Sequence, residues 1–188
     1  EEEKNNPGFA AQLARLGELY VNDAFGTAHR AHASTEGVAH HLHAVAGFLM
    51  EKEITYLDEA LAHPARPYVA VLGGAKVSDK IGVLKRLLEQ VDRVLIGGGM
   101  AYTFLKAQGH AIGASTLEAD KVELAGQLLK KAAERKVNVL LPLDHIITTS
   151  LDAGSQDKVT AAVDIPDGWL GVDIGPETAA LFVRVLLD

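Results

Sequence analysis

The sequence has no cysteine, only one tryptophan and no long apolar run. Without cysteine the chain can form neither a disulfide nor a thiolate metal site, which fits a reducing compartment. A membrane-spanning helix needs about 18 or more consecutive apolar residues, and no such run occurs. No segment has the pattern of a signal peptide. We therefore expect a cytoplasmic protein without a membrane partner.

Basic residues are also scarce. The 188 residues contain 18 Lys and Arg against 25 Asp and Glu, a net charge of −7, and no segment is densely basic. This balance gives little support to nucleic-acid binding. The hydrophobic share of 48% is ordinary for a globular protein. Such a chain can form one large domain or two small ones.

The two ends of the sequence predict an internal piece of a longer protein. Glu1 is not a start methionine, and residues 1–8 (EEEKNNPG) are typical of a surface turn. Residues 176–188 predict a helix that stops without a glycine or another C-cap. We therefore expect further natural sequence on both sides of this chain.

Hydrophobic periodicity divides the chain near residues 61–67, a turn-rich stretch with two prolines. Before it we predict a helix, a short buried strand, an irregular histidine-rich stretch and a long amphipathic helix, over residues 6–16, 19–22, 27–42 and 46–61. After it, strands are predicted over residues 68–72, 93–96 and 138–141, alternating with helices over residues 79–88, 100–107 and 118–135. This alternation predicts an α/β fold with a parallel sheet, and the helix over 46–61 would connect two α/β lobes.

The most informative stretch, residues 69–105, contains a strand–glycine turn–helix unit twice. The first apolar run stops at Gly73-Gly74 and the second at Gly97-Gly98-Gly99. In a parallel sheet both turns lie at the carboxyl edge, where ligands bind. Three consecutive glycines are entropically costly, which favours close approach of a flat or anionic group over a merely flexible turn.

The first of these turns carries two lysines, Lys76 and Lys80, one helical turn apart. A glycine turn exposes main-chain N–H groups, a helix N-terminus attracts anions, and an ammonium group can follow a moving phosphoryl group. The stretch therefore predicts a phosphate site, although it is not a Walker A sequence. A turn with two solvated lysines is the alternative.

Three other features have weaker functional interpretations. Arg30 lies in a glycine-flanked loop and could grip a carboxylate or phosphate, or form a surface salt bridge. The histidines around it lack the partners of a metal site, so we expect no protein-bound metal. Residues 23–26 (DAFG), which begin with Asp23, look similar to the DFG motif of protein kinases, but we interpret this match as spurious. Trp169, between glycines, could pack in the core or form one wall of a flat cleft.

Six segments of the chain resemble phosphoglycerate kinases. They are VNDAFGTAHRAHAST (21–35), AGFLMEKE (46–53), RPYVAVLGGAKVSDKI (66–81), LIGGGMAYTFLKAQG (95–109), LLPLD (140–144) and IPDGWLGVDIGP (165–176). The segments run in the family's order and cover nearly the whole chain. The resemblance implies two Rossmann-like parallel-sheet lobes joined by a long interdomain helix, both incomplete here. Residues 1–45 would end the phosphoglycerate-binding lobe, 46–67 would form the helix and linker, and 68–188 would begin the nucleotide-binding lobe.

The implied activity is reversible phosphoryl transfer between 1,3-bisphosphoglycerate and ADP, giving 3-phosphoglycerate and ATP in glycolysis. This enzyme is a phosphotransferase with a carboxyl group as acceptor. Mg²⁺ would enter with ATP or ADP, its protein ligand lying outside this chain, and the parent would be a monomer. Because other family site residues would precede Glu1 or follow Asp188, we expect the isolated chain to have negligible activity. It would otherwise be a non-catalytic nucleotide-binding module or a folding fragment.

The resemblance also assigns the catalytic residues, Arg30 and Lys76. Arg30 matches the family arginine that grips the phosphoglycerate, and Lys76 matches the lysine that follows the transferring phosphoryl group. Lys80 matches a lysine that binds nucleotide phosphates.

The remaining nucleotide-binding residues implied by the resemblance are small. Gly74 and Ala75 would line the phosphate turn. Gly98 and Gly99 would pack on the adenine, and Gly171 would lie against the same base from the other side.

Overall fold

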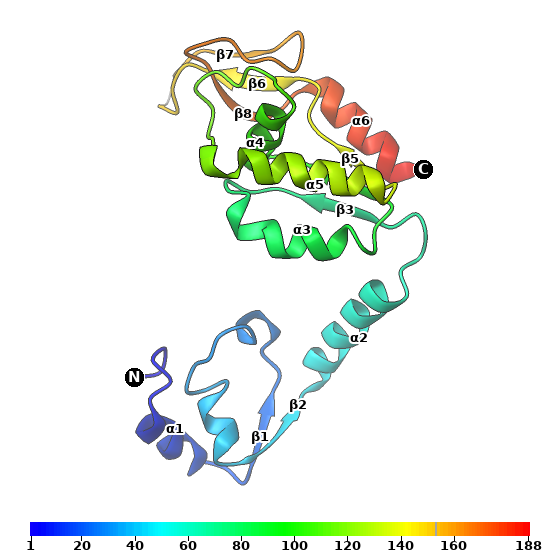
Figure 1. Ribbon diagram of the computed structural model, residues 1–188. Coiled ribbons are helices and arrows are strands. Elements are labelled where there is room, and N and C mark those ends of the chain that lie inside the picture. The colour runs from blue at the N-terminus through cyan, green and yellow to red at the C-terminus, as the bar shows by residue number, and fades with distance from the viewer. Residues whose placement is uncertain (153) are drawn as a thin grey trace. The chain divides into compact units, whose positions relative to one another are not determined.

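The computed structural model describes residues 1–152 and 154–188, and the chain divides into two compact units, Glu1–Pro64 and Ala65–Asp188 (Figure 1). Both units contain strands paired in parallel and helices, so the predicted α/β class is confirmed. Within the described residues, no helix is both long enough and apolar enough to cross a membrane.

The first unit contains a two-stranded parallel sheet and two α-helices. In chain order its elements are α1 (Pro7–Ala14), β1 (Leu19–Asn22), the 3-10 helices η1 (Phe25–Thr27) and η2 (Gly37–His40), β2 (His43–Ala46) and α2 (Phe48–Ala62). Asn6 caps α1 by accepting a hydrogen bond from the Phe9 N–H at 3.0 Å. The expectation that β1 is buried is wrong. Leu19 is 52% exposed and Val21 51%, because that face of the two-stranded sheet is left open to solvent.

Helix α2 begins two residues later than predicted. Residues up to Ala46 belong to β2, which pairs with β1 and which the sequence pattern did not reveal. Asp23 caps the N-terminus of this helix, because its carboxylate accepts the N–H groups of Leu49 at 2.7 Å and Met50 at 3.0 Å. The aspartate of the DAFG sequence therefore has a structural role as a helix cap.

The second unit is built on a parallel sheet in the order β3-β4-β5. These strands are Val69–Leu72, Arg93–Ile96 and Asn138–Leu140. The helices that follow them are η3 (Ser78–Lys80), α3 (Ile81–Leu87), α4 (Met100–Ala107), η4 (Ala119–Lys121) and α5 (Val122–Glu134). Strand β4 and helix α4 have the predicted bounds. The helix predicted over 118–135 is shorter in the structure, because its first turn is the 3-10 helix η4 and α5 begins only at Val122.

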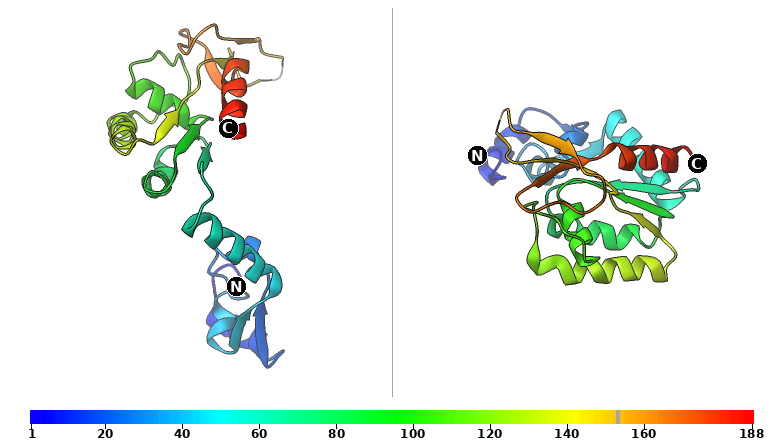
Figure 2. Two further views of the ribbon diagram at one scale, coloured as in Figure 1. Left: turned by 90° about the vertical axis from the view of Figure 1, so that its right-hand side faces the viewer. Right: turned by 90° about the horizontal axis from the view of Figure 1, so that it is seen from above.

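The sheet of the second unit separates two apolar layers (Figure 2). One face packs against α3, α4 and α5, with Phe104, Leu84 and Ile96 fully buried. The other face packs against α6 (Pro176–Leu187), whose Phe182 contacts Leu95 of β4. This alternation along β4 is the period of two expected for a strand buried on both faces.

An antiparallel sheet in the order β7-β6-β8 completes the second unit. Its strands are β6 (His145–Thr148), β7 (Asp157–Val159) and β8 (Leu170–Ile174). The sequence pattern predicted no strand over β6 or β7. Strands β6 and β7 are short and mixed in polarity. They form because β6 pairs with β7 on one side and with β8 on the other, not because of a local sequence pattern.

His145, the first residue of β6, is a buried imidazole, and within the described residues no hydrogen bond of ordinary geometry reaches either ring nitrogen. Its ring packs against Tyr102 with 5.4 Å between the ring centres. Burial lowers the pKa of His145, because the charged form would lose its hydration. The Val163 backbone lies near enough to oppose this effect of burial on the pKa only in part.

We expect the second unit to lose stability as the pH falls below about 6.5, the ordinary histidine pKa. The unfolded chain takes up a proton there, whereas the buried imidazole resists it until the pH reaches its lowered pKa. His145→Phe should remove this dependence and stabilise the unit by about 1–3 kcal/mol, because no unpaired ring nitrogen stays buried. Urea unfolding at pH 7.5 and 5.5, followed by Trp169 fluorescence, measures both effects. The exposed His41, changed to Phe, is the control, and an unaltered pH dependence in His145→Phe would contradict the prediction.

Candidate functional site

The two glycine turns of the second unit contact each other at the carboxyl edge of the sheet. Gly98 has a φ of +67°, and a methyl group on its Cα would lie 2.9 Å from the Gly74 nitrogen. A methyl group on Gly99 would lie 3.2 Å from the Ala75 carbonyl oxygen. The Met100 N–H donates to the Gly74 carbonyl at 2.8 Å. The structure therefore brings together Gly74, Ala75, Gly98 and Gly99, as the repeated strand–turn–helix unit predicts.

The lysine of η3 lies over the first of these turns. A methyl group on Gly74, whose φ is +147°, would lie 3.1 Å from Cε and 3.6 Å from Nζ of Lys80. Lys80 is half-buried, whereas Lys76 is exposed. A side chain at position 74 would thus compete with Lys80 for space. With glycine at this position, the Lys80 ammonium group lies beside bare backbone.

A carboxylate occupies the start of the helical segment that follows Lys76. Glu118 accepts hydrogen bonds from the N–H groups of Val77 and Ser78 and, at 2.6 Å, from the Ser78 hydroxyl. The N–H groups of Val77 and Ser78 are therefore already bonded to a carboxylate of this chain. The Ser78 hydroxyl, assisted by the two N–H groups, holds the pKa of Glu118 below its usual range against the effect of desolvation.

Strand β8 lies beside the second glycine turn and α4. A methyl group on Gly171 would overlap the phenol of Tyr102, and the Gly171 N–H donates to the Ser115 hydroxyl at 2.9 Å. A methyl group on Gly97 would lie 3.7 Å from the Ile174 side chain. Burial, with a smaller contribution from the nearby Asp173, raises the pKa of Tyr102 to about 12, so this phenol stays neutral.

Trp169 packs against the core of the second unit rather than standing apart from it. The Lys158 ammonium lies 4.0 Å from the centre of its ring, in the geometry of a cation–π contact. Of the two interpretations of Trp169 from the sequence, core packing is the one that these contacts support.

Arg30 belongs to the first unit and lines a pocket of about 340 Å³. Its carbonyl accepts the Thr35 hydroxyl at 2.8 Å, which fixes the backbone of the loop. Among the salt bridges of the described residues none involves Arg30. The remaining residues of the pocket lining are Asn22, Ala28, Thr35, Glu36, Ala39 and His40.

Comparison with known proteins decides the family. The sequence model described as phosphoglycerate kinase matches residues 1–188. The chain belongs to the phosphoglycerate kinase family. This membership rests on the full length of the chain, and it agrees with the six segments from which the resemblance was drawn.

Curated relatives include a phosphoglycerate kinase of Moorella thermoacetica, 59% identical over 186 residues, with 99% of this chain and 47% of the relative covered. A cytosolic phosphoglycerate kinase of Nicotiana tabacum is 58% identical over 187 residues, again covering 99% and 47%. The solved phosphoglycerate kinase of Coxiella burnetii matches with a TM-score of 0.83 at 43% identity, over 98% of this chain and 48% of that one. The chain spans about half the length of the curated relatives it matches.

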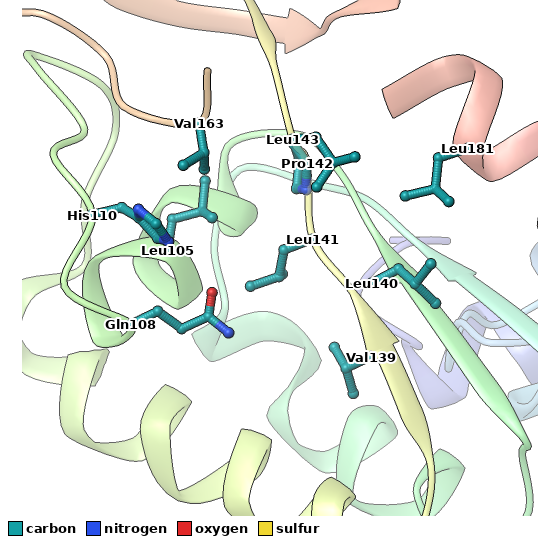
Figure 3. Close-up of a pocket in the computed structure, with 10 residues that line it drawn as sticks. All are labelled: Leu105, Gln108, His110, Val139, Leu140, Leu141, Pro142, Leu143, Val163 and Leu181. Carbon is teal, nitrogen blue, oxygen red and sulfur yellow. The ribbon is translucent and has the colours of Figure 1, made fainter. Parts of the chain in front are cut away.

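A further surface pocket of this phosphoglycerate kinase chain, about 440 Å³, opens at the carboxyl end of β5 (Figure 3). Leucine and valine side chains form most of its walls, and Gln108 and His110 add polar groups. None of the residues predicted for the nucleotide site lines it. The other lining residues are Leu105, Val139, Leu140, Leu141, Pro142, Leu143, Val163 and Leu181.

The acidic and histidine side chains of this chain do not gather into a metal site in the part that the structure describes. No group of three or more His, Asp or Glu residues there could hold an ion.

Proposed function

We propose that this chain is part of a phosphoglycerate kinase that reversibly transfers a phosphoryl group between 1,3-bisphosphoglycerate and ADP, giving 3-phosphoglycerate and ATP. The observation that carries the proposal is the family match over residues 1–188, with relatives named phosphoglycerate kinase at up to 59% identity. The first unit would bind the phosphoglycerate and the second the nucleotide. The protein would act in the cytoplasm as a monomer, without nucleic-acid or membrane partners.

The proposed chemistry is positioning and charge stabilisation, because a transferring phosphoryl group needs little covalent help from protein. Arg30 would grip the phosphoglycerate with its planar guanidinium, and Lys76 would stabilise charge on the transferring group. Lys80, which lies over Gly74, would hold nucleotide phosphates. Mg²⁺ would neutralise phosphate charge, and we propose that its protein ligand lies outside these 188 residues.

The adenine would pack on the glycine surface formed by Gly98 and Gly99, with Gly171 on its other side. Support for this placement comes from the close approach of the two glycine turns and from the neighbouring position of β8. All these elements belong to the second unit. That observation also favours a second candidate, a nucleotide-binding module that is not catalytic by itself.

A coupled assay of ATP formation from 1,3-bisphosphoglycerate and ADP tests the kinase. We expect turnover from the full reading frame that encodes this chain and negligible turnover from the 188 residues alone. A full-length protein without turnover would refute the kinase proposal. Calorimetry with ADP on the 188-residue chain tests the nucleotide module separately.

We expect Gly98→Ala to weaken ADP binding by the chain at least tenfold. A residue other than glycine is strained at this φ by roughly 1–2 kcal/mol, and its methyl group would lie 2.9 Å from the Gly74 nitrogen. The two turns would have to separate, which would disrupt the proposed adenine surface. Gly82→Ala in α3 is the matched control, since its methyl group would meet nothing within 4 Å. Equal ADP affinity in Gly98→Ala and the control would contradict the prediction.

A further inference from the structure

Glu118 lies between α4 and η4, forty residues along the chain from the lysine-bearing turn that it contacts. Its backbone N–H donates to the Thr103 hydroxyl at 3.3 Å, and Thr103 is almost fully buried in α4. Helix α4 starts directly after the second glycine turn. The backbone of Glu118 is thereby attached to the helix that directly follows Gly98 and Gly99.

The carboxylate of Glu118 is attached to the other turn. One oxygen, Oε2, accepts the N–H groups of both Val77 and Ser78, and the second, Oε1, accepts the Ser78 hydroxyl at 2.6 Å. Val77 is fully buried, so this short segment is held by core packing on one side and by Glu118 on the other. Lys76 immediately precedes the segment and Lys80 follows it.

Resting on the proposed function, we propose that Glu118 is a positioning residue of the nucleotide site. Its carboxylate fixes the Val77–Ser78 segment to α4, and thereby sets Lys76 and Lys80 relative to the glycine surface. Glu118 contacts backbone and a serine hydroxyl, and it acts on the nucleotide only through the lysines that it places.

A carboxylate near a phosphate-binding turn also has an opposite, purely electrostatic effect. Its negative charge repels phosphate oxygens, so its removal would strengthen ADP binding if charge alone mattered. Positioning predicts weaker ADP binding after the same removal. The sign of the change therefore separates a positioning residue from a competing anion.

The experiment compares ADP and adenosine binding to the 188-residue chain by calorimetry. Glu118→Ala removes all three side-chain hydrogen bonds, and we expect it to raise the Kd for ADP roughly tenfold, as for the loss of hydrogen bonds to a charged group. The Kd for adenosine should not change, because adenosine has no phosphate for the lysines to bind. Tighter ADP binding, unchanged ADP binding, or an equal loss for both ligands would overturn the proposal.

Glu118→Gln provides the conservative rescue. A glutamine oxygen can accept both N–H groups, and its amide can donate to the Ser78 hydroxyl, so the segment stays fixed without the charge. We expect ADP affinity within about twofold of the unaltered chain. An ADP affinity of Glu118→Gln as low as that of Glu118→Ala would refute positioning by hydrogen bonds. Asp120→Ala is the charge-matched control, since Asp120 is exposed and pairs only with its neighbour Lys121 among the described salt bridges.

Two further measurements distinguish a failure of the proposed function from a failure of the positioning role of Glu118. Circular dichroism checks that each variant is folded. If the unaltered chain itself binds no ADP, the proposal of a nucleotide-binding module is refuted. Amide hydrogen exchange at Val77 and Ser78 then tests whether Glu118 fixes this segment. Faster exchange in Glu118→Ala, with recovery in Glu118→Gln, supports the fixed segment, and identical exchange in all three chains refutes it.

Discussion

Lys76→Ala is expected to lower kcat by roughly 10²–10³-fold in the full-length kinase that we propose contains this chain, as for the loss of one preorganised donor. Lys76 is exposed and follows the turn at the carboxyl end of β3, where a phosphoryl group would be transferred. An ammonium group there stabilises charge that is greatest in the transition state. KM for ADP should change much less than kcat, because Lys80, which lies over Gly74, would in the proposed site still hold the nucleotide phosphates.

Steady-state rates of ATP formation at varied ADP measure kcat and KM separately. Lys85→Ala is the matched control, because Lys85 is another exposed lysine of the same unit, in the last turn of α3. Unaltered turnover in Lys76→Ala would refute the catalytic role. A rise in KM with constant kcat would assign Lys76 to ground-state binding alone.

The largest expected effect on stability is that of Asp144→Ala, which should lower the free energy of unfolding of the second unit by about 3 kcal/mol. Asp144 is only 2% exposed. Its carboxylate accepts the Thr178 N–H at 2.8 Å, the Glu177 N–H at 3.0 Å and the Thr178 hydroxyl at 2.6 Å. Alanine would leave these donors at the start of α6 without their acceptor.

The same contacts predict a pH dependence. Desolvation alone would raise the pKa of Asp144, but the Thr178 hydroxyl and the two N–H groups outweigh it and hold the pKa below its usual range. The stabilisation is therefore present above about pH 4, the ordinary aspartate value, and is lost as the pH falls through the lowered pKa.

Urea unfolding at pH 7, followed by the fluorescence of Trp169 in the same unit, measures the effect of Asp144→Ala. The exposed Asp167, changed to Ala, controls for the loss of one negative charge. A loss of less than about 1 kcal/mol, the value of one ordinary hydrogen bond, would contradict the cap assigned to Asp144.

Local signals in the sequence were sufficient for most elements of the second unit. Strand β4 and helix α4 have the predicted bounds, and β3, β5 and α6 differ from prediction by one residue at one end. Each element is an apolar run or a helical period that ends at glycine, a charged turn or proline, so neighbouring residues suffice to define it. The close approach of Gly74 and Gly98 also followed, because consecutive parallel strands place their carboxyl ends at one edge.

Contacts between distant residues were not predictable in the same way. Strand β2 exists because it pairs with β1, and β6 exists because it pairs with β7 and with β8. Glu118 carried no sequence signal as a partner of Ser78, since forty residues separate them. Its carboxylate also accepts the Val77 and Ser78 N–H groups, a contact that no local pattern indicates.

The sequence by itself determined the α/β class, the family and the two glycine turns with their lysines, because these depend on residues close together along the chain. Only the tertiary structure decided which side chains contact those turns and the helix starts of the second unit. Glu118 holds the Val77–Ser78 segment, Lys80 lies over Gly74, and Asp144 caps α6. The physical reason is that a hydrogen bond forms wherever folding brings donor and acceptor within about 3 Å, and this distance in space has no fixed counterpart in sequence separation.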